Sequence, residues 1–568
     1  MPTIHNPILR GFNPDPSICR VGEDFYIAVS TFQWFPGVLV YHSRNLETWT
    51  LASRPLQRRS QLDMAGNPSS GGIWAPCLTH AEGQFWLIYT DVKNWAGSPP
   101  DHGNGFKDTH NYLVTAPDIQ GPWSEPIYLN SSGFDPSLFH DEDGKKYLLN
   151  QVWDYRPGHN SFAGIVLQEY DHRRRRLVGP RSNIFSGTSI GVTEAPHLYK
   201  RGDYYYLMTA EGGTEYAHAV TLARSKSLTG PYELHPQTPL LSSVRDRQGF
   251  REARKEARDE TPFLFPGLQK AGHGSMVPWQ GDEWILAHLC GRPLPGTQHC
   301  PLGRETALQR LTWREDAWPW PDEPGSRTTV EFSQRPGLAN TAKKSTRQPG
   351  IYQPDGVQIH PRIWQEDFNA PGWSKELQTL RIPADDRYDI RSRPGWLRLT
   401  GAESPTSRFR QSLLARRAQS FRWRGETKLS AVPEDFQQFA GLVVRYDEAT
   451  QYILRIQGDG QGGQSLGIIV FDQQRINLPL AEQEVPVDGS QLWLAVRMDY
   501  RTLQFEWSQD GSAWQTIGPE LDASKLSDEY AHPMGFTGTF LGLGCFDLSG
   551  RSFTADFDYL TYQEEDHD

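Results

Sequence analysis

One arrangement of hydrophobic and polar positions recurs five times in the N-terminal half of this 568-residue chain. Each copy holds a few apolar residues, a short polar turn and a cluster of aromatic and aliphatic residues, which is typical of two short β-strands joined by a turn. The leading residues are separated by 59, 61, 59 and 79 positions; they are Asp15, Trp74, Asp135, Glu194 and His273. A repeat of this length corresponds to one four-stranded sheet, so the pattern predicts a five-bladed β-propeller.

A second all-β pattern begins near Trp364. Its segments alternate or are strongly apolar, and they are Gly441–Tyr446, Tyr452–Ile456, Leu466–Phe471, Leu492–Met498, Leu503–Trp507 and Phe553–Tyr559. Asp510-Gly511 is a tight-turn signal, and strands separated by short turns indicate a jelly-roll, concanavalin A-like β-sandwich. We therefore expect an all-β chain with a catalytic propeller at 1–322, a linker at 323–362 and a sandwich domain at 363–568.

Two charged stretches interrupt these patterns. The segment Arg245–Glu260 is densely charged and coincides with the longest repeat spacing, which indicates an exposed, possible helical insertion whose role is open. The run Arg173–Arg176 lies between strand-like segments and is interpreted as a solvated hairpin. The formal net charge of −11 argues against nucleic acid or an anionic membrane as the partner.

The cysteines and the N-terminus favour a cytoplasmic location. The five cysteines are few, odd in number and without paired metal-ligand spacing, so reduced thiols are expected. The first residues lack a basic region followed by an apolar one, and no apolar run approaches the roughly 20 residues that cross a bilayer.

Three of the leading residues are carboxylic acids. Because the first strand of every propeller blade faces the central channel, Asp15, Asp135 and Glu194 are expected to converge there. Hydrolysis of a glycosidic bond needs one acid to protonate the leaving oxygen and one carboxylate to activate water or to attack the sugar. A third carboxylate can raise the pKa of the acid and orient it. The aromatic content of 12% suits both sugar stacking and ordinary strand packing.

Seven motifs spread along the chain carry a resemblance to a known family; they are Asn13–Ser17, Gly72–Pro76, Phe106–Tyr112, Gly133–Ser137, Thr193–His197, Gly272–Ser275 and Cys300–Ala307. With them the chain resembles glycoside hydrolase family 43, specifically its two-domain β-xylosidases. The resemblance implies that Asp15 is the general base, Glu194 the general acid, and Asp135 the residue that tunes and positions that acid. It also implies inversion at the anomeric carbon.

Further site residues follow from the same resemblance. Arg304 is similar to a family arginine that binds sugar hydroxyls, and Phe32 and Trp74 resemble the walls around the terminal sugar. Phe540 is similar to a sandwich residue that narrows the mouth of the pocket. His273 resembles a histidine that in some relatives holds calcium or another divalent cation in the channel through waters, although calcium prefers oxygen ligands.

The expected activity is that of an exo-acting, inverting xylan 1,4-β-xylosidase. It would release xylose from the non-reducing end of short β-1,4-xylo-oligosaccharides, with α-L-arabinofuranosidase side activity as a possibility and no cofactor required for the chemistry. An arabinofuranosidase or arabinan-degrading enzyme is the alternative within the class. A noncatalytic sugar-binding propeller is the alternative outside it, because propellers host many functions. A homo-oligomeric state is left open.

Overall fold

The computed structural model describes residues 4–95, 105–244, 268–321, 362–487, 491–532 and 534–565. These residues form β-strands, with one 3-10 turn, η1 (Ala523–Lys525), among them. The expected all-β class is confirmed. The expected insertion Arg245–Glu260 lies outside the described residues, as does the expected linker 323–362 except for its last residue. The domain boundaries given above stay a prediction.

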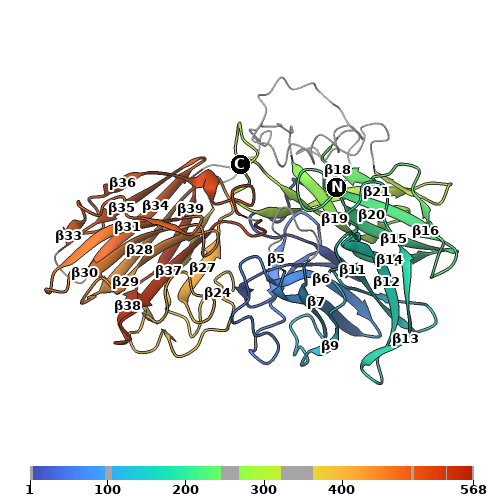
Figure 1. Ribbon diagram of the computed structural model, residues 1–568, viewed down its shortest axis with the longest axis horizontal. Coiled ribbons are helices and arrows are strands. Elements are labelled where there is room, and N and C mark those ends of the chain that lie inside the picture. Colours follow the sequence, from blue (N-terminus) through green and yellow to red (C-terminus); the bar gives the residue numbers. More distant parts are fainter. Residues whose placement is uncertain are drawn as a thin grey trace. The chain divides into compact units, whose positions relative to one another are not determined.

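The N-terminal half forms five sheets that follow one another along the chain, from blue to light green in Figure 1. Blade 1 contains β1 (Ser17–Val21), β2 (Asp24–Val29), β4 (Leu39–Ser43) and β5 (Thr50–Ser53). Blade 2 contains β6 (Gly72–Ala81), β7 (Gln84–Asn94), β8 (Asp108–Ala116) and β9 (Ile127–Asn130). Blade 3 contains β10 (Ser137–His140), β11 (Lys146–Trp153), β12 (Phe162–Asp171) and β13 (Arg176–Phe185). Blade 4 contains β14 (Glu194–Arg201), β15 (Tyr204–Glu211), β16 (Ala219–Ser225), β17 (Glu233–Leu234) and β18 (Leu241–Ser242). Blade 5 contains β19 (Gln269–Gln280), β20 (Glu283–Gly291), β21 (Arg304–Trp313) and β22 (Pro319–Pro321). The predicted five-bladed propeller is confirmed.

Apolar side chains between neighbouring blades hold the propeller together. Ile27 of blade 1 packs in one buried cluster with Ile285 of blade 5, and similar clusters join blades 2 and 3, 3 and 4, and 4 and 5. The ring closes where the N-terminal segment runs beside β21: Leu9 bridges Thr306, and the Asn6 side chain binds the backbone of Leu308. This closure delivers residue 15 to the start of blade 1.

The C-terminal half forms two antiparallel sheets. The first contains β23 (Ile363–Glu366), β25 (Tyr388–Asp389), β26 (Leu397–Thr400), β28 (Arg422–Ala431), β34 (Gln491–Asp499), β35 (Thr502–Ser508), β36 (Gln515–Asp522), β38 (Thr554–Phe557) and β39 (Leu560–Glu564). The second contains β27 (Ser412–Arg417), β29 (Gln438–Arg445), β30 (Gln451–Gly458), β31 (Gln464–Asp472), β32 (Arg475–Asn477), β33 (Val485–Val487) and β37 (Phe540–Asp547). The six predicted segments all contain strands, and Gly511 adopts a φ of 76° in the predicted turn.

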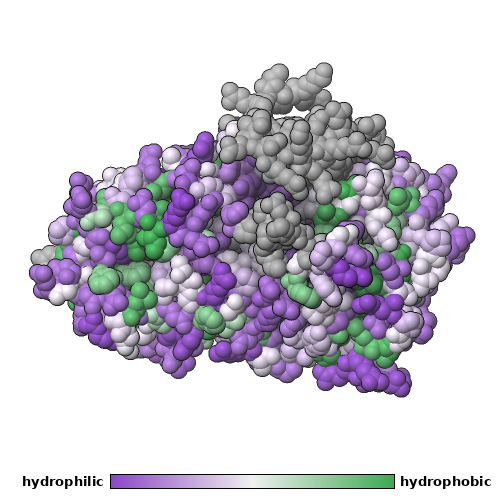
Figure 2. Space-filling model, viewed as in Figure 1, coloured by the Kyte–Doolittle hydropathy of each residue, from purple (hydrophilic) through white to green (hydrophobic). Residues whose placement is uncertain are grey.

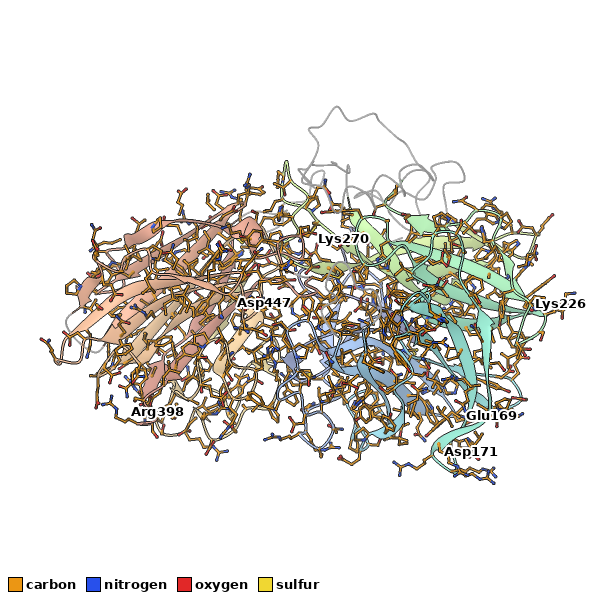
Figure 3. All side chains as sticks on the ribbon, in the orientation of Figure 1. Glu169, Asp171, Lys226, Lys270, Arg398 and Asp447 are labelled. Carbon is orange, nitrogen blue, oxygen red and sulfur yellow. The ribbon has the colours of Figure 1, made fainter. Side chains whose placement is uncertain are left out.

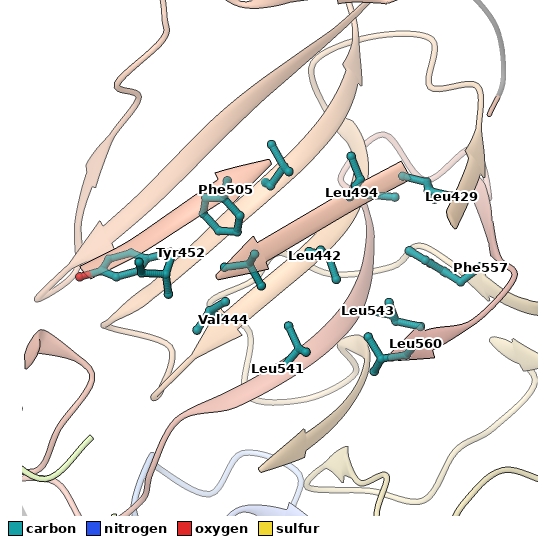
Figure 4. Close-up of a cluster of buried hydrophobic side chains, with 14 of the residues drawn as sticks. Leu429, Leu442, Val444, Tyr452, Leu494, Phe505, Leu541, Leu543, Phe557 and Leu560 are labelled. Carbon is teal, nitrogen blue, oxygen red and sulfur yellow. The ribbon is translucent and has the colours of Figure 1, made fainter. Parts of the chain in front are cut away.

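The core of the sandwich follows from strand alternation, since successive side chains point to opposite faces. Leu442 and Val444 of β29, Leu494 of β34, and Leu541 and Leu543 of β37 all contribute to one buried cluster (Figure 4). The remaining strands, β3 (Trp34–Phe35) and β24 (Thr379–Leu380), pair with each other. Residues 33–35 and 294–303 belong to the second compact unit with the sandwich, while the other described residues up to 321 belong to the first.

Truncating this core should destabilise the protein measurably. Leu494 is fully buried, so Leu494→Ala removes apolar contacts and leaves a cavity, at an expected cost of about 2–5 kcal/mol in the free energy of unfolding. Ile476 is 64% exposed, and the matched Ile476→Ala should change it by less than about 0.5 kcal/mol. Denaturant unfolding of the full chain measures both variants. Equal effects of the two substitutions would contradict this account of the core.

The surface is largely hydrophilic in the view of Figure 2, with small separate hydrophobic patches. Three of the four arginines of the predicted hairpin lie in the connection from β12 to β13 and Arg176 begins β13; the carboxylate of Asp171 accepts the backbone N–H groups of Arg173 and Arg174. Figure 3 labels Asp171 at this end of β12. In the part of the chain that the structure describes, no helix has the length and hydropathy of a membrane span.

Candidate active site

The first strand of each blade begins at a backbone kink. One residue at each start has a positive φ of 39–55°, and these residues are Asp15, Ala75, Asp135, Ala195 and His273. They recur every 60 residues over the first four blades. Glu194 and Trp74 each precede their kink by one residue, so they are not strictly equivalent to Asp15 and Asp135. A left-handed residue redirects the chain, which explains why adjacent positions in different blades can both face the same site.

Asp15 accepts hydrogen bonds from a side chain of blade 1 and a side chain of blade 5, and a histidine of blade 5 lies close to it. The Ser30 hydroxyl donates to Asp15 Oδ2 at 2.6 Å, and Arg304 Nη1 donates to Oδ1 at 3.1 Å. His273 Nδ1 lies 3.7 Å from the same Oδ1. The Ser30 hydroxyl also accepts the backbone N–H of Ala75, which links Asp15 to blade 2. The hydrogen bonds from Ser30 and Arg304 fix the orientation of the Asp15 carboxyl group, and a general base must be held in such a defined position.

The three carboxylic acids are buried, with exposed fractions of only 4% for Asp15, 7% for Asp135 and 6% for Glu194. Burial and then the negative charges of Glu194 and Asp15 raise the pKa of Asp135 well above its usual value. The backbone N–H of Ala195, the residue after Glu194, donates to the carboxylate of Asp135 and opposes that rise. Asp135 is therefore tied directly to the segment that carries Glu194.

Glu194 has the environment of a proton donor. Burial and the nearby charge of Asp15 raise its pKa to about 8, against the opposing effects of Arg304 and Lys107. Its Oε1 atom is buried and has no hydrogen-bond partner among the described residues. An acid of this kind is protonated at neutral pH, and a free oxygen can reach a ligand instead of the protein.

Aromatic rings lie beside Arg304, the arginine that donates to Asp15. The ring centroids of Phe32 and Trp74 lie 6.1 Å apart, and Trp74 contacts Phe134 edge-on at 5.5 Å. The Arg304 guanidinium carbon lies 5.3 Å from the Phe32 ring centroid. The Trp74 indole donates to the Ser70 carbonyl at 2.8 Å, which fixes its orientation. Phe32, Trp74 and Arg304 thus lie within one network that includes Asp15.

The environment of His273 bears on the expected metal. Burial lowers the pKa of His273, so its imidazole is neutral and could act as a ligand. No three His, Cys, Asp or Glu side chains are grouped to hold a metal ion within the described ranges. A cation bound at this place would have His273 and Asp15 as its protein ligands and little else from the described residues. No step of the mechanism below involves a metal.

Phe540, the remaining expected site residue, belongs to the second compact unit. It is fully buried there and stacks on Trp34, with ring centroids 3.8 Å apart. Its expected role at the mouth of the pocket stays a prediction.

Two residues near the carboxylates were not singled out from the sequence. Ser30 follows β2 and touches Asp15, but an isolated serine after a strand carries no signal. Lys107 lies inside a family motif, which was the signal available. Its ammonium lies 4.3 Å from the Trp153 ring centroid, and its charge acts on Glu194. Burial lowers the pKa of Lys107 to about 8, although Glu194 opposes this effect.

A propeller that gathers three buried carboxylic acids, one with an elevated pKa, beside an arginine and aromatic rings defines a glycoside hydrolase type of site. Comparison with known proteins agrees. Residues 4–319 match the glycosyl hydrolases family 43, and residues 365–563 match the β-xylosidase C-terminal concanavalin A-like domain. The chain belongs to glycoside hydrolase family 43 and is a glycoside hydrolase.

Several relatives match over the whole chain. A β-xylosidase of Bacillus subtilis is 45% identical, with 99% of this chain and 100% of the relative covered. Xylosidase/arabinosidase 43B of Humicola insolens is 44% identical over 100% and 99% of the two chains. The crystal structure of a xylan β-1,4-xylosidase from Bacillus halodurans C-125 superposes with a TM-score of 0.87 at 49% identity, covering 99% of this chain and all of that one.

Proposed function

We propose that this protein is an exo-acting, inverting β-xylosidase that releases xylose from the non-reducing end of short β-1,4-xylo-oligosaccharides. The observation that carries the proposal is the division of roles between two buried carboxylic acids. Asp15 accepts hydrogen bonds from Ser30 and Arg304, whereas Glu194 has a pKa of about 8 and an Oε1 atom without a hydrogen-bond partner among the described residues. Glycoside hydrolysis requires one carboxylic acid that donates a proton and a second carboxyl group that activates the attacking water.

In the proposed mechanism, Glu194 donates its proton to the glycosidic oxygen as the bond to the leaving sugar breaks. Asp15 removes a proton from a water molecule, whose oxygen attacks the anomeric carbon from the opposite face. The sugar carbon is therefore inverted, and Asp15 and Glu194 must exchange protons with solvent before the next cycle. Asp135 holds the Ala195 N–H and positions the acid, and Arg304 is proposed to bind sugar hydroxyls between Phe32 and Trp74.

The substrate assignment is supported by the names of relatives with full-length coverage. The Bacillus subtilis relative is a β-xylosidase, and the Bacillus halodurans structure is that of a xylan β-1,4-xylosidase. The test is the release of sugar from xylobiose and xylotriose, with proton NMR of the first product. We expect xylose, formed first as the α-anomer. An initial β-anomer would contradict inversion, and failure to cleave either substrate would contradict the substrate class.

α-L-Arabinofuranosidase activity is the second candidate, because the Humicola insolens relative is a xylosidase/arabinosidase. Rates on nitrophenyl β-xyloside and nitrophenyl α-L-arabinofuranoside, measured with the same enzyme, separate the two. Faster cleavage of the xyloside supports the main proposal, and faster cleavage of the arabinofuranoside supports the alternative.

The activity should depend on pH through Glu194. Since the acid must be protonated, kcat/KM should fall as pH rises through about 8, the pKa that burial and Asp15 give Glu194. Replacing Asp135 with asparagine changes the group that accepts the Ala195 N–H beside Glu194, so it should reshape this alkaline limb of the pH profile and reduce turnover. Initial rates of xylobiose cleavage between pH 5 and 10 measure both effects. If the alkaline limb of the pH–rate profile were the same in Asp135→Asn as in the parent enzyme, Asp135 would have no role in setting the protonation of Glu194.

Two assignments that involve other parts of the molecule remain proposals. The first proposal is a divalent cation such as calcium near His273. An increase in the activity of chelator-treated enzyme on adding calcium or manganese would support it, and unchanged activity would contradict it. Phe540 is proposed to narrow the mouth of the pocket, so Phe540→Ala should raise KM for xylobiose. An unchanged KM would assign Phe540 to packing alone.

The cytoplasm is the proposed compartment. The five cysteines are all buried, and reduced thiols, which are usual in that compartment, are proposed for them. Short oligosaccharides are also the substrates that a cell can import. Size-exclusion chromatography with light scattering would decide whether the protein is a homo-oligomer.

A further inference from the structure

The loop that leads into Glu194 is tied at both ends to one buried carboxylate. Glu211 ends β15, next to Ala210, which pairs with Glu194 across the sheet. Glu211 Oε1 accepts the Thr188 backbone N–H at 2.7 Å and the Thr193 hydroxyl at 2.8 Å, and Oε2 accepts the Thr188 hydroxyl. Thr188 lies near the start of the loop, and Thr193 immediately precedes Glu194. One side chain therefore joins both ends of segment 188–193.

This segment has a backbone that needs such a restraint. Gly187 and Gly191 have φ values of 86° and 78°, and Val192 has a φ of 57°. A β-branched residue in the left-handed region is a rare, strained conformation that persists only where surrounding contacts enforce it. Ala195, immediately after Glu194, has a φ of 51°, so Glu194 lies between two left-handed residues. Its side chain direction depends on how firmly both sides are held.

The fit around Glu211 is close. Its side chain is fully buried, and a Cβ on Gly187 would lie 2.0 Å from Thr193 Oγ1 and 3.1 Å from Glu211 Oε1. The Gly212 N–H donates to the Gly191 carbonyl at 2.8 Å, so the residue after Glu211 holds the middle of the same loop. An ionised carboxylate accepts hydrogen bonds and donates none, which matches three donors aimed at Glu211. Burial raises the pKa of Glu211, and the hydrogen bonds from Thr188 and Thr193 oppose that rise.

We propose that Glu211 is a positioning residue for the general acid: through Thr188 and Thr193 it fixes the loop that aims Glu194 at the glycosidic oxygen. The inference rests on the proposed role of Glu194. Glu211 is not among the charges that shift the pKa of Glu194, so it acts through geometry. Misplacing a catalytic group by about 1 Å can cost on the order of 10²-fold in rate.

The test compares Thr193→Val, which removes the hydroxyl with little change of shape, with Thr193→Ser, which keeps it. Thr193→Val should lower kcat on xylobiose by about 10- to 100-fold, but lower kcat on a dinitrophenyl xyloside by less than about 3-fold, because this leaving group needs little protonation. Thr193→Ser should retain most activity on both substrates. Glu211→Gln, which places an amide before three donors, should show the same selective loss as Thr193→Val.

The outcomes separate this inference from the proposed function. Glu194→Ala, assayed in parallel, gives the pattern expected for loss of the acid itself. If Glu194→Ala is selective for xylobiose while Thr193→Val and Glu211→Gln lose both substrates equally, or lose neither, the positioning role is overturned and the acid assignment stands. If Glu194→Ala itself is not selective, the acid assignment fails and the positioning role fails with it. Thermal unfolding of each folded variant identifies equal losses that come from instability.

Discussion

Replacing Asp15 with alanine should lower kcat/KM by about 10³-fold on xylobiose and on a dinitrophenyl xyloside alike. Every substrate of an inverting enzyme needs an activated water, so the quality of the leaving group cannot compensate for the lost base. The substitution also removes the acceptor of the Ser30 and Arg304 hydrogen bonds and leaves that guanidinium without its carboxylate partner Asp15. Steady-state rates of purified variant and parent on both substrates measure the effect.

A chemical rescue sharpens this test. Azide needs no deprotonation before it attacks, so added azide should restore turnover of the dinitrophenyl xyloside by Asp15→Ala and form an α-xylosyl azide. Azide should not raise the turnover of the parent enzyme, because its Asp15 already activates water. A β-configured azide would indicate a retaining geometry, and Asp15→Ala with near-parent activity would remove Asp15 from the role of base.

Replacing Glu194 with alanine should produce a strongly selective loss. The xylose alkoxide is a poor leaving group and needs the proton of Glu194, so kcat/KM on xylobiose should fall by about 10³- to 10⁴-fold. Dinitrophenolate leaves readily without protonation, and the loss on its xyloside should stay within about 10-fold. The part of the alkaline limb near pH 8 that comes from Glu194 should also vanish from the residual activity, because its carboxyl group is gone.

The matched control is Glu142→Ala, which removes an exposed carboxylate from a turn of the same propeller. It should leave the rates on both substrates near those of the parent. Equal losses on xylobiose and on the aryl xyloside in Glu194→Ala would contradict its role as acid. Taken with Asp15→Ala, the two variants assign acid and base independently of any structure of a complex.

Much of the fold was predictable because its signals are local. A β-strand alternates its side chains with a period of two, and a propeller repeats the same four-stranded unit, so both leave regular marks on the sequence. The five blades and the two-sheet sandwich were read from such marks, and so were the strands that carry Leu442, Leu494 and Leu543. The candidate carboxylates Asp15, Asp135 and Glu194 were found because each leads a repeat.

Other features depend on contacts between residues far apart in the chain. Ser30 touches Asp15 across two strands, and Glu211 reaches Thr188 and Thr193 from the neighbouring strand. Neither residue lies at a distinctive position in a motif. The spacing of 59 and 61 residues also concealed that Glu194 precedes its backbone kink whereas Asp15 occupies one. The membership of residues 33–35 and 294–303 in the second unit had no compositional signal.

By itself, the sequence determined the repeat, the strands and the identity of the acids, because these follow from side-chain periodicity and from which residues can donate or accept a proton. Only the tertiary structure decided how the acids differ. The elevated pKa of Glu194, the hydrogen bonds that Asp15 accepts from Ser30 and Arg304, and the hydrogen bonds of Glu211 arise from burial and from neighbours supplied by other parts of the chain. Protonation depends on the local dielectric and on nearby charges, and these exist only once the chain has folded.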